Sequence, residues 1–324
     1  MTDRVLVTGA AGFAGGHLLD RIERDPHVEI FAWRRPGEPL PAGRTDADPR
    51  IHWVTLDLRD REAVTAAVAD ARPGLVYHLA GAAHVGDAWA RTAEALEINA
   101  LGTHYVIDAL RWCGLRPRML IPSSAYVYQP SDAAIPEDGP VRPDSPYGLS
   151  KLAQEMIGRK AAQRDGIPVV IARAFNHIGP RQASSFSTSS FARQIATIET
   201  GRAEPVMFVG NLSARRDLTD VRDTVRAYQL LLARGAPARV YNVCSGVARV
   251  VSDVLHGLRA LARVPIEVRV DPARLRPSDT PLVLGDFTRL RDEIGWRPEI
   301  PFERTLQDLL EYWRAAVAVQ SAQS

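Results

Sequence analysis

The sequence predicts an α/β fold: a doubly wound parallel sheet with a smaller, interleaved α/β lobe. Up to Phe175, short apolar segments alternate with segments of helical spacing, the pattern of a parallel sheet covered by helices on both faces. Loop-rich segments then follow, and an apolar strand pattern returns at 240–246. A chain of 324 residues is long enough for one large α/β domain or for two lobes with a cleft between them.

Each element of the first half follows from the period of its apolar residues. In chain order, we expect a strand at 4–10, a helix after the glycines of 9–15, strands at 28–33 and 51–58, a helix at 61–71, a strand at 74–81, a helix near 94–113, a strand at 118–124, a helix opened by Ser145, and a strand at 168–175. Right-handed crossovers place the carboxyl ends of all the strands at one edge of the sheet, where ligands bind.

The second half is expected to hold a smaller set of elements. They are a helix near 189–200, a short strand at 205–210, a strand at 240–246 that returns to the core and, between 251 and 314, a helix, a strand at 266–270, a proline-rich link and a last helix. We therefore expect two domains, a larger one of residues 1–175 plus 217–246 and a smaller one of residues 176–216 plus 247–324.

Composition excludes several classes of partner. The 40 basic and 38 acidic residues leave a net charge of +2 with no long run of like charge, so we expect no nucleic acid. The sequence shows no signal peptide and no segment able to span a bilayer, so we expect no membrane. Cys113 and Cys244 form neither a disulfide framework nor a zinc site, which favours a cytoplasmic location. His84 and His177 lack further ligands at metal spacing, so no metal is expected.

A glycine-rich turn, TGAAGFAG, follows the first strand and begins a helix. Gly9, Gly12 and Gly15 would let the backbone approach a pyrophosphate, and the amino end of the helix would supply free N–H groups. The spacing differs from the Gly-x-Gly-x-x-Gly fingerprint, so a tight turn without a ligand stays an alternative. With the ligand, this arrangement predicts a Rossmann-like, dinucleotide-binding larger domain.

The second strand ends in Arg34 and Arg35, where an acidic residue would bind the ribose hydroxyls of NAD(H). A guanidinium group suits a 2′-phosphate instead, so NADP(H) is favoured and NAD(H) stays an alternative. Both arginines would also fit a solvated loop in an arginine-rich chain.

The segment SPYGLSK starts a helix, with Ser145 as N-cap and Pro146 at its first position. Tyr147 and Lys151 then lie at i and i+4 on one face, where an ammonium would lower the pKa of a phenol and make it a usable acid. Only two of the 40 basic residues are lysines, which makes a lysine at 151 unusual here. The alternative is an exposed polar pair on an ordinary helix.

Ser124 lies in SSAYVY, directly after a strand at the ligand-bearing edge. Its hydroxyl could donate a hydrogen bond to a carbonyl oxygen as charge develops there. Taken alone, it would equally suit a serine that caps a turn.

The motifs TGAAGFAG, LDLRD, YHLAG, SSAYVY, YGLSK and FNHIGP, in this order, resemble those of the extended short-chain dehydrogenase/reductase family, which acts on nucleotide sugars. The resemblance covers essentially the whole chain. It implies a catalytic triad of Ser124, Tyr147 and Lys151, with Tyr147 and Lys151 also at the cofactor. It further implies pyrophosphate contacts from Gly9, Gly12, Phe13 and Ala14, adenine contacts from Asp57 and Leu58, and cofactor contacts from Leu79 and Ala80.

The second half is similar to GDP-mannose 4,6-dehydratases and even more to GDP-6-deoxy-4-keto-D-mannose reductases, through FNHIGPRQ, VGNLSARRDLTDVRD, VYNVCSG, RLRPSDTPLVLGD and IGWRP. This implies a nucleotide-sugar-binding smaller domain in which Asn176, Arg216 and Arg276 hold the substrate diphosphate and Asp279 accepts from its ribose. Members of the family commonly dimerise through helices that correspond to 97–112 and 147–162, so a homodimer or higher homo-oligomer is expected.

In the dehydratases that the chain resembles, the position of Tyr126 holds a glutamate, which removes a proton from the sugar. A phenol without its own lysine is a poor base. The expected function is therefore NADPH-dependent reduction of the 4-keto group of a GDP-4-keto-6-deoxyhexose, with a product such as GDP-rhamnose. Because glutamate also occurs at this position in the reductases, a 4,6-dehydratase or an epimerase with tightly bound NAD(P) stays an alternative. A non-catalytic dinucleotide sensor is the second alternative.

Overall fold

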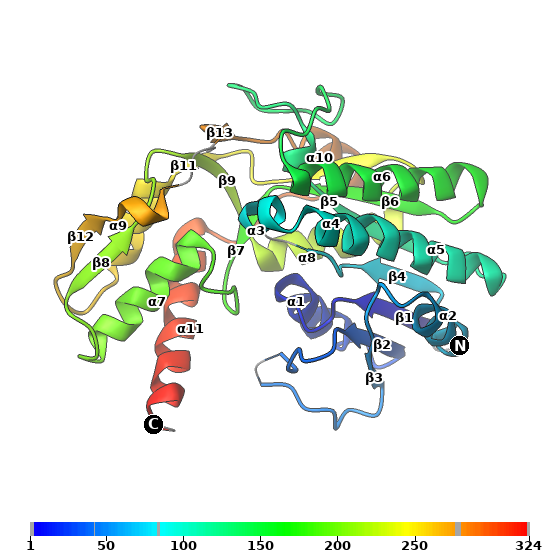
Figure 1. Cartoon of the computed structure of the whole chain (residues 1–324), viewed down its shortest axis with the longest axis horizontal. Coiled ribbons are helices and arrows are strands. Elements are labelled where there is room, and N and C mark those ends of the chain that lie inside the picture. Colours follow the sequence, from blue (N-terminus) through cyan, green and yellow to red (C-terminus); the bar gives the residue numbers. More distant parts are fainter. Residues whose placement is uncertain (1–2, 42, 83–84, 276–279, 323–324) are drawn as a thin grey trace.

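The computed structural model of the chain describes residues 3–41, 43–82, 85–275 and 280–322. The described residues form two lobes that lie side by side (Figure 1). The larger lobe holds the central sheet and the amino terminus. The smaller lobe carries the last helix, α11 (Phe302–Ala322), and with it the carboxyl-terminal end of the chain.

The larger lobe is built on a seven-stranded sheet of order β10-β6-β5-β4-β1-β2-β3, in which every neighbouring pair is parallel. The strands are β1 (Asp3–Thr8), β2 (Val28–Arg34), β3 (Ile51–Thr55), β4 (Leu75–His78), β5 (Arg118–Ser124), β6 (Val169–Ala174) and β10 (Val240–Val243). The predicted fold class and the predicted return of a core strand near 240 are confirmed.

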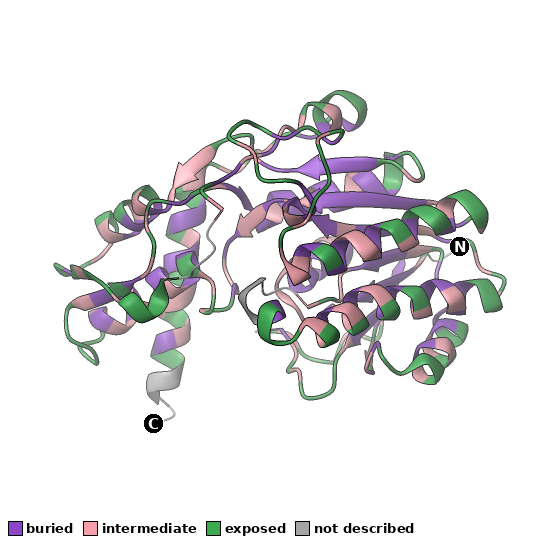
Figure 2. Ribbon diagram, turned by 45° about the horizontal axis from the view of Figure 1, so that its top comes forward, coloured by how far each residue is buried: buried purple, intermediate pink, exposed green. Residues whose placement is uncertain are grey.

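Helices cover both faces of this sheet and create two separate cores. One face is covered by α1 (Phe13–Ile22), α8 (Val221–Arg234) and α10 (Thr288–Ile294), and the other by α2 (Arg61–Ala71), α5 (Gly102–Trp112) and α6 (Pro146–Arg164). The strands are buried between helices whose outer faces are exposed (Figure 2). This is the double winding that the alternating sequence pattern predicts.

The helix expected near 94–113 is confirmed, and it contains a π-helical turn that the sequence did not predict. The structure has α3 (Val85–Ala90), α4 (Thr92–Leu96), a π-helical turn η1 (Glu97–Leu101) and then α5. The extra residue in the π turn carries Asn99 inward, where its side chain hydrogen-bonds both the backbone of Ala82 and the hydroxyl of Ser150. Apolar periodicity does not register an inserted polar contact of this kind.

The smaller lobe has its own core. One of its sheets contains β7 (Asn176–Ile178), β9 (Arg215–Asp220), β11 (Ala248–Val250) and β13 (Leu282–Val283), and the other pairs β8 (Val206–Val209) with β12 (Glu267–Val270). Its helices are α7 (Ser187–Glu199), α9 (Val251–Ala260) and α11. Two short helical turns remain: η2 (Ala125–Val127), which follows β5, and η3 (Pro272–Arg274), which follows β12. Apolar side chains from α7, α9 and α11 pack together there. The domain limits given above stay a prediction.

The outer surface of α5, α6 and η1 carries large apolar side chains. Trp112 is 76% exposed, and Leu101, Leu149 and Met156 are exposed as well. None of the helices in the described residues is long and apolar enough to cross a membrane.

Candidate active site

The glycine turn lies at the carboxyl end of β1, pressed against the end of β4. Gly9 has a φ of 66°, and a Cβ placed on it would lie 2.7 Å from the backbone nitrogen of Ala80. A Cβ on Gly15 would lie 2.1 Å from the carbonyl oxygen of Gly9. A side chain at either position would overlap the neighbouring backbone, so both positions require glycine.

The first turn of α1 faces the same edge of the sheet. Gly12 is its N-cap and supplies no side-chain hydrogen bond, so the leading N–H groups around Phe13 and Ala14 have no side-chain cap among the described residues. The glycines leave space that Cβ atoms would fill, and the helix behind them begins without a side-chain cap. Together these two features fit the pyrophosphate of a dinucleotide. Phe13 also stacks on His177, with ring centroids 5.7 Å apart, and so joins this turn to the smaller lobe.

The ends of β2 and β3 hold the residues expected at the adenosine. Arg34 donates to the Thr55 hydroxyl (3.0 Å) and to the carbonyl of Glu38 (3.2 Å), whereas the side chain of Arg35 is 80% exposed. Asp57 accepts hydrogen bonds from the guanidinium and from the backbone N–H of Arg59, which lower the pKa of its carboxyl group. Leu58 is buried.

The start of α6 has the local structure that the sequence predicts. Ser145 accepts a hydrogen bond from the backbone N–H of Gly148 (3.1 Å), and Pro146 occupies the first helical position. A Cβ on Gly148 would lie 2.2 Å from the carbonyl oxygen of Tyr126, so the helix begins in direct contact with η2. This contact brings α6 to the end of β5, where Ser124 lies.

Ser124 and Tyr147 come together there. The hydroxyl of Ser124 lies near enough to the phenol of Tyr147 to lower its pKa, and its oxygen accepts a hydrogen bond from the backbone N–H of Tyr126 (3.2 Å). The rings of Tyr126 and Tyr147 meet edge to face with centroids 6.2 Å apart. The phenol of Tyr126 therefore lies at the same site as the predicted acid.

The pKa of Tyr147 differs from the expectation. Burial raises it to about 12, the nearby hydroxyl of Ser124 lowers it, and Tyr126 raises it further. Desolvation of the phenolate thus outweighs the favourable contacts. The phenol is protonated at neutral pH, which is the state that a proton donor needs.

Lys151 lies one turn further along α6 and is buried, with 7% of its surface exposed. Burial lowers its pKa to about 7, and the carboxylate of Glu155 raises it. Glu155 itself forms a buried ion pair with Arg173 (2.6 Å). The hydrogen bond that the ammonium makes is to the side-chain oxygen of Gln154.

Leu79 and Ala80 follow β4 and lie next to this site. The backbone N–H of Ala80 donates to Thr8 (3.1 Å), and a Cβ on Gly81 would lie 4.0 Å from the Lys151 Nζ atom. The loop after β4 therefore runs between the glycine turn and the lysine.

The predicted substrate residues lie on the sheet of the smaller lobe. Asn176 opens β7, and its side-chain oxygen is buried without a hydrogen-bond partner among the described residues. Arg216 on β9 donates to the carbonyl of Thr280 (2.7 Å). Arg276 and Asp279 lie outside the described residues.

The expectation about metals concerns His84, which lies outside the described residues, and His177, which is buried. Burial lowers the pKa of His177, and its ring nitrogen contacts the carbonyl of Phe175 (3.2 Å). Within the described parts of the chain, no three side chains of the metal-ligating types gather.

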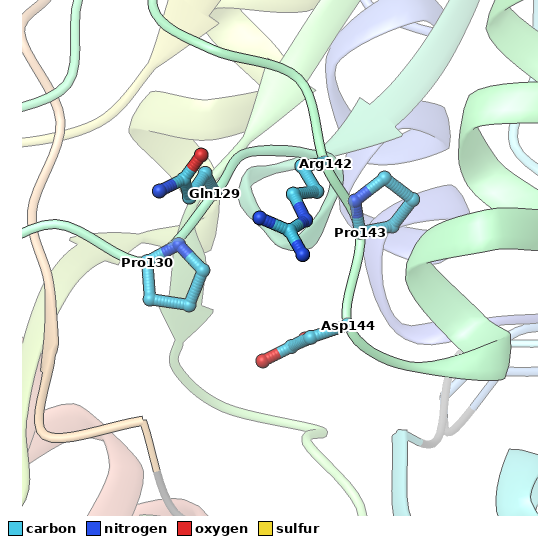
Figure 3. A pocket seen from close by; sticks show the side chains of 5 residues that line it. All are labelled: Gln129, Pro130, Arg142, Pro143 and Asp144. Atoms are coloured by element: carbon cyan, nitrogen blue, oxygen red, sulfur yellow. The ribbon is translucent and has the colours of Figure 1, made fainter.

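A pocket of about 350 Å³ lies between the segment after η2 and the loop that leads into α6. Figure 3 shows the guanidinium of Arg142 between Gln129 and Pro130 on one side and Pro143 on the other, with Asp144 below. None of these residues is a predicted site residue. The pocket borders the start of α6 and not the glycine turn.

Four residues buried beneath the site were not predicted from the sequence: Asn99, His78, Thr103 and Gln154. Each is a polar residue inside an apolar element. Buried polar groups require partners, so a polar residue at a buried position was a usable signal, but each of these residues has at least one partner 17 to 70 positions away in the chain.

A parallel sheet with a glycine turn after β1 and a Ser, Tyr, Lys set around β5 and α6 defines an extended short-chain dehydrogenase/reductase. The family described as GDP-mannose 4,6 dehydratase matches residues 6–309, and the chain belongs to it. The predicted family is thereby confirmed.

Individual relatives agree with this placement. The chain is 36% identical over 320 residues to the GDP-6-deoxy-D-mannose reductase of Pseudomonas aeruginosa, covering 98% of this chain and 99% of that protein. The solved structure of RMD from Pseudomonas aeruginosa complexed with NADPH has a TM-score of 0.82 at 34% identity, covering 97% and 100% of the two chains. The UDP-glucose 4-epimerase of Thermus thermophilus in complex with NAD has a TM-score of 0.84 at 27% identity, covering 97% and 99%. These relatives are oxidoreductase-type enzymes of nucleotide sugars, and the chain belongs among them.

Proposed function

We propose that this protein reduces the 4-keto group of a GDP-4-keto-6-deoxyhexose with NADPH, giving a GDP-6-deoxyhexose of the GDP-rhamnose type. The observation that carries the proposal is the similarity over the full length to a GDP-6-deoxy-D-mannose reductase. A second feature supports reduction over dehydration: Tyr126 occupies the position at which the dehydratases have a glutamate that removes a proton from the sugar.

The protein's own residues divide the chemistry between them. Tyr147 donates a proton to the keto oxygen, and its raised pKa keeps that proton in place until the oxygen becomes negative. Ser124 hydrogen-bonds the same oxygen, and Lys151 holds the nicotinamide ribose beside the phenol. The bound NADPH supplies the hydride that the carbonyl carbon accepts.

The dinucleotide would lie along the carboxyl edge of the sheet. Gly9, Gly12, Phe13 and Ala14 would bind its pyrophosphate through the uncapped start of α1. Asp57 and Leu58 would contact the adenine, and Leu79 and Ala80 the middle of the cofactor. Arg34 and Arg35 would bind the 2′-phosphate, which favours NADP(H) over NAD(H).

The substrate would be held by the smaller lobe. The buried side-chain oxygen of Asn176 has no hydrogen-bond partner in the part of the chain that the structure describes, and a ligand hydroxyl would satisfy it. Arg216 and Arg276 would bind the diphosphate, and Asp279 would accept from the ribose.

The test is a measurement of NADPH absorbance with GDP-4-keto-6-deoxymannose as substrate. We expect oxidation of NADPH in proportion to the sugar added, and none with GDP-mannose. A flat trace from correctly folded protein would remove the reductase. Turnover of GDP-mannose or another nucleotide sugar without added reductant would instead identify a dehydratase or an epimerase.

A further inference from the structure

A chain of buried hydrogen bonds runs beneath the candidate active site, from the glycine turn to the lysine. Its members come from β1, β4, α5 and α6 and are Thr8, His78, Thr103, Gln154 and Lys151. The first four are at most 1% exposed. Consecutive members are joined by hydrogen bonds of 2.9 Å (Thr8 to His78), 2.8 Å (His78 to Thr103) and 2.8 Å (Thr103 to Gln154), and Gln154 accepts from Lys151.

The direction of the upper bonds follows from Thr103, which has one hydrogen to donate. The carbonyl of Asn99 lies 2.7 Å away and can only accept, so it takes that hydrogen. The oxygen of Thr103 therefore accepts from the amide N–H of Gln154. This turns the side-chain oxygen of Gln154 toward the Lys151 ammonium, since the opposite orientation would set two donors against each other.

The lower bonds complete the same pattern. Because the oxygen of Thr103 accepts from His78 as well, the imidazole carries its proton on Nε2 and presents a bare Nδ1 to the hydroxyl of Thr8. Burial and the charge of Lys151 lower the pKa of His78 to about 3, so the ring is neutral. The oxygen of Thr8 in turn accepts from the N–H of Ala80. The hydrogen bonds thus run toward Thr103 from both sides, from Thr8 through His78 and from Lys151 through Gln154, and Thr103 donates in turn to the carbonyl of Asn99.

Carboxylates near the lysine are committed elsewhere. Those on α6 and on the described parts of the elements packed against it pair with arginines, as Glu155 with Arg173, Glu94 with Arg91, Glu97 with Arg59, and Asp108 with Arg61. The remaining ionisable groups on these elements are Tyr147, Arg159, Lys160 and Arg164 on α6, His104, Tyr105 and Arg111 on α5, Arg118 on β5, and Tyr126 on η2. The hydrogen-bond partner of the Lys151 ammonium is therefore a neutral amide, while Glu155, which pairs with Arg173, raises the pKa of the lysine only through its charge.

We propose that Gln154 is a positioning residue, whose amide, oriented by Thr103 and His78, keeps the Lys151 ammonium charged and fixed beside Tyr147. The proposal rests on the reductase function given above. A neutral acceptor stabilises the ammonium without cancelling its charge. A carboxylate at this position would hold the lysine but neutralise it, and an apolar side chain would not hold it.

The test uses the scarcity of lysine in this chain. With ¹³C-labelled lysine, the only side-chain Cε signals come from Lys151 and Lys160, and Lys160→Arg assigns them. We expect the titration midpoint of Lys151 to rise by about one pH unit in Gln154→Glu and to fall by about one unit in Gln154→Met. Gln163, exposed on the same helix, provides the matched controls Gln163→Glu and Gln163→Met, which should leave the midpoint unchanged.

Kinetics supply the second measurement. Gln154→Glu and Gln154→Met should each lower kcat about tenfold and leave the KM for the keto sugar within twofold of the wild-type value. The alkaline limbs of their pH profiles of kcat should move in opposite directions. Midpoints that stay in place, or that move in the same direction, would overturn the proposal, because a merely structural role would give only a common loss of stability. If Gln154→Met does not fold, the upward shift in Gln154→Glu decides alone. If the midpoints move as expected but wild-type protein oxidises no NADPH, the proposed function fails while the hold of Gln154 on Lys151 stands.

Discussion

The two ends of the carboxyl edge of the sheet hold their charges differently. At the catalytic end Tyr147 is partly buried, Lys151 is buried, and hydrogen bonds link the lysine to the neutral side chains of Gln154 and Thr103. At the adenosine end, around Arg35 and Asp57, the side chains are largely in water and paired in short-range ion pairs. The first arrangement fixes geometry before any ligand arrives, whereas the second can adjust to one.

This difference predicts which kinetic parameter each end controls. Buried groups with defined partners act on the transition state, because displacing them changes the chemistry of the reacting atoms. Exposed charges are screened by water and salt and act on binding. Changes at the catalytic end should therefore appear in kcat, and changes at the adenosine end in KM.

The largest effect is expected at Tyr147. Replacing it in Tyr147→Phe removes the proton donor and should lower kcat by about a thousandfold, within the range for loss of a general acid. NADPH should bind as before, as measured by fluorescence titration. Tyr312→Phe in the smaller lobe is the control and should keep full activity. If Tyr147→Phe also kept the wild-type rate, the catalytic end of the sheet edge would not carry the chemistry.

The pH profile should show the next largest effect. Because burial lowers the pKa of Lys151 to about 7, the charged form is present below that pH and is lost as the pH rises through it. We expect kcat/KM to fall about tenfold per unit above the limb. The phosphates of a bound dinucleotide favour the ammonium, so the limb in kcat should lie at higher pH. A flat kcat/KM between about pH 6 and 9 would contradict this account of the lysine.

Arg35 should have a moderate effect confined to binding. Arg35→Ala removes a cation that would face the 2′-phosphate, and we expect the KM for NADPH to rise about tenfold at low salt with kcat unchanged. The KM for NADH should not change, since NADH lacks that phosphate. Arg24→Ala, an exposed arginine after α1, is the control. If Arg35→Ala raised the KM for NADH as much as the KM for NADPH, Arg35 would act by general attraction of the cofactor and not by binding the 2′-phosphate.

The smallest effect on activity is expected at the outer face of the catalytic end. We propose that Trp112 and its exposed apolar neighbours on α5 and α6 form a homodimer contact. Trp112→Ser should then shift the mass measured by light scattering from dimer to monomer, with kcat within twofold, because the buried chain faces the other side of the helices. Val319→Ser on α11 should leave the mass unchanged, and a wild-type monomer would refute the contact.

The elements that could be predicted from the sequence depend on local rules. Ser145 and Pro146 start α6 because capping needs only neighbouring residues, and the cap is seen as expected. The glycine turn is likewise a local requirement, met by the positive φ of Gly9. The π turn at Asn99 was not predictable, because its partners at Ala82 and Ser150 are distant in the chain.

The sign of the pKa shift at Tyr147 was also beyond the sequence. Spacing places Lys151 on the same helical face, but the degree of burial depends on how η2 and the loop before α6 pack over the phenol. The causes that act on this pKa are desolvation, Ser124 and Tyr126, and the charge of Lys151, which the spacing predicts, is not among them.

By itself, the sequence determined the order of strands and helices, the ligand-bearing edge and the residue types present there, because periodicity, capping and glycine geometry act within a few residues. Only the tertiary structure decided which buried polar groups meet, how the amide of Gln154 turns and how far Tyr147 and Lys151 are withdrawn from water. Those outcomes depend on contacts between β1, β4, α5 and α6, and the free energy of a buried hydrogen bond or charge is set by all of its neighbours at once.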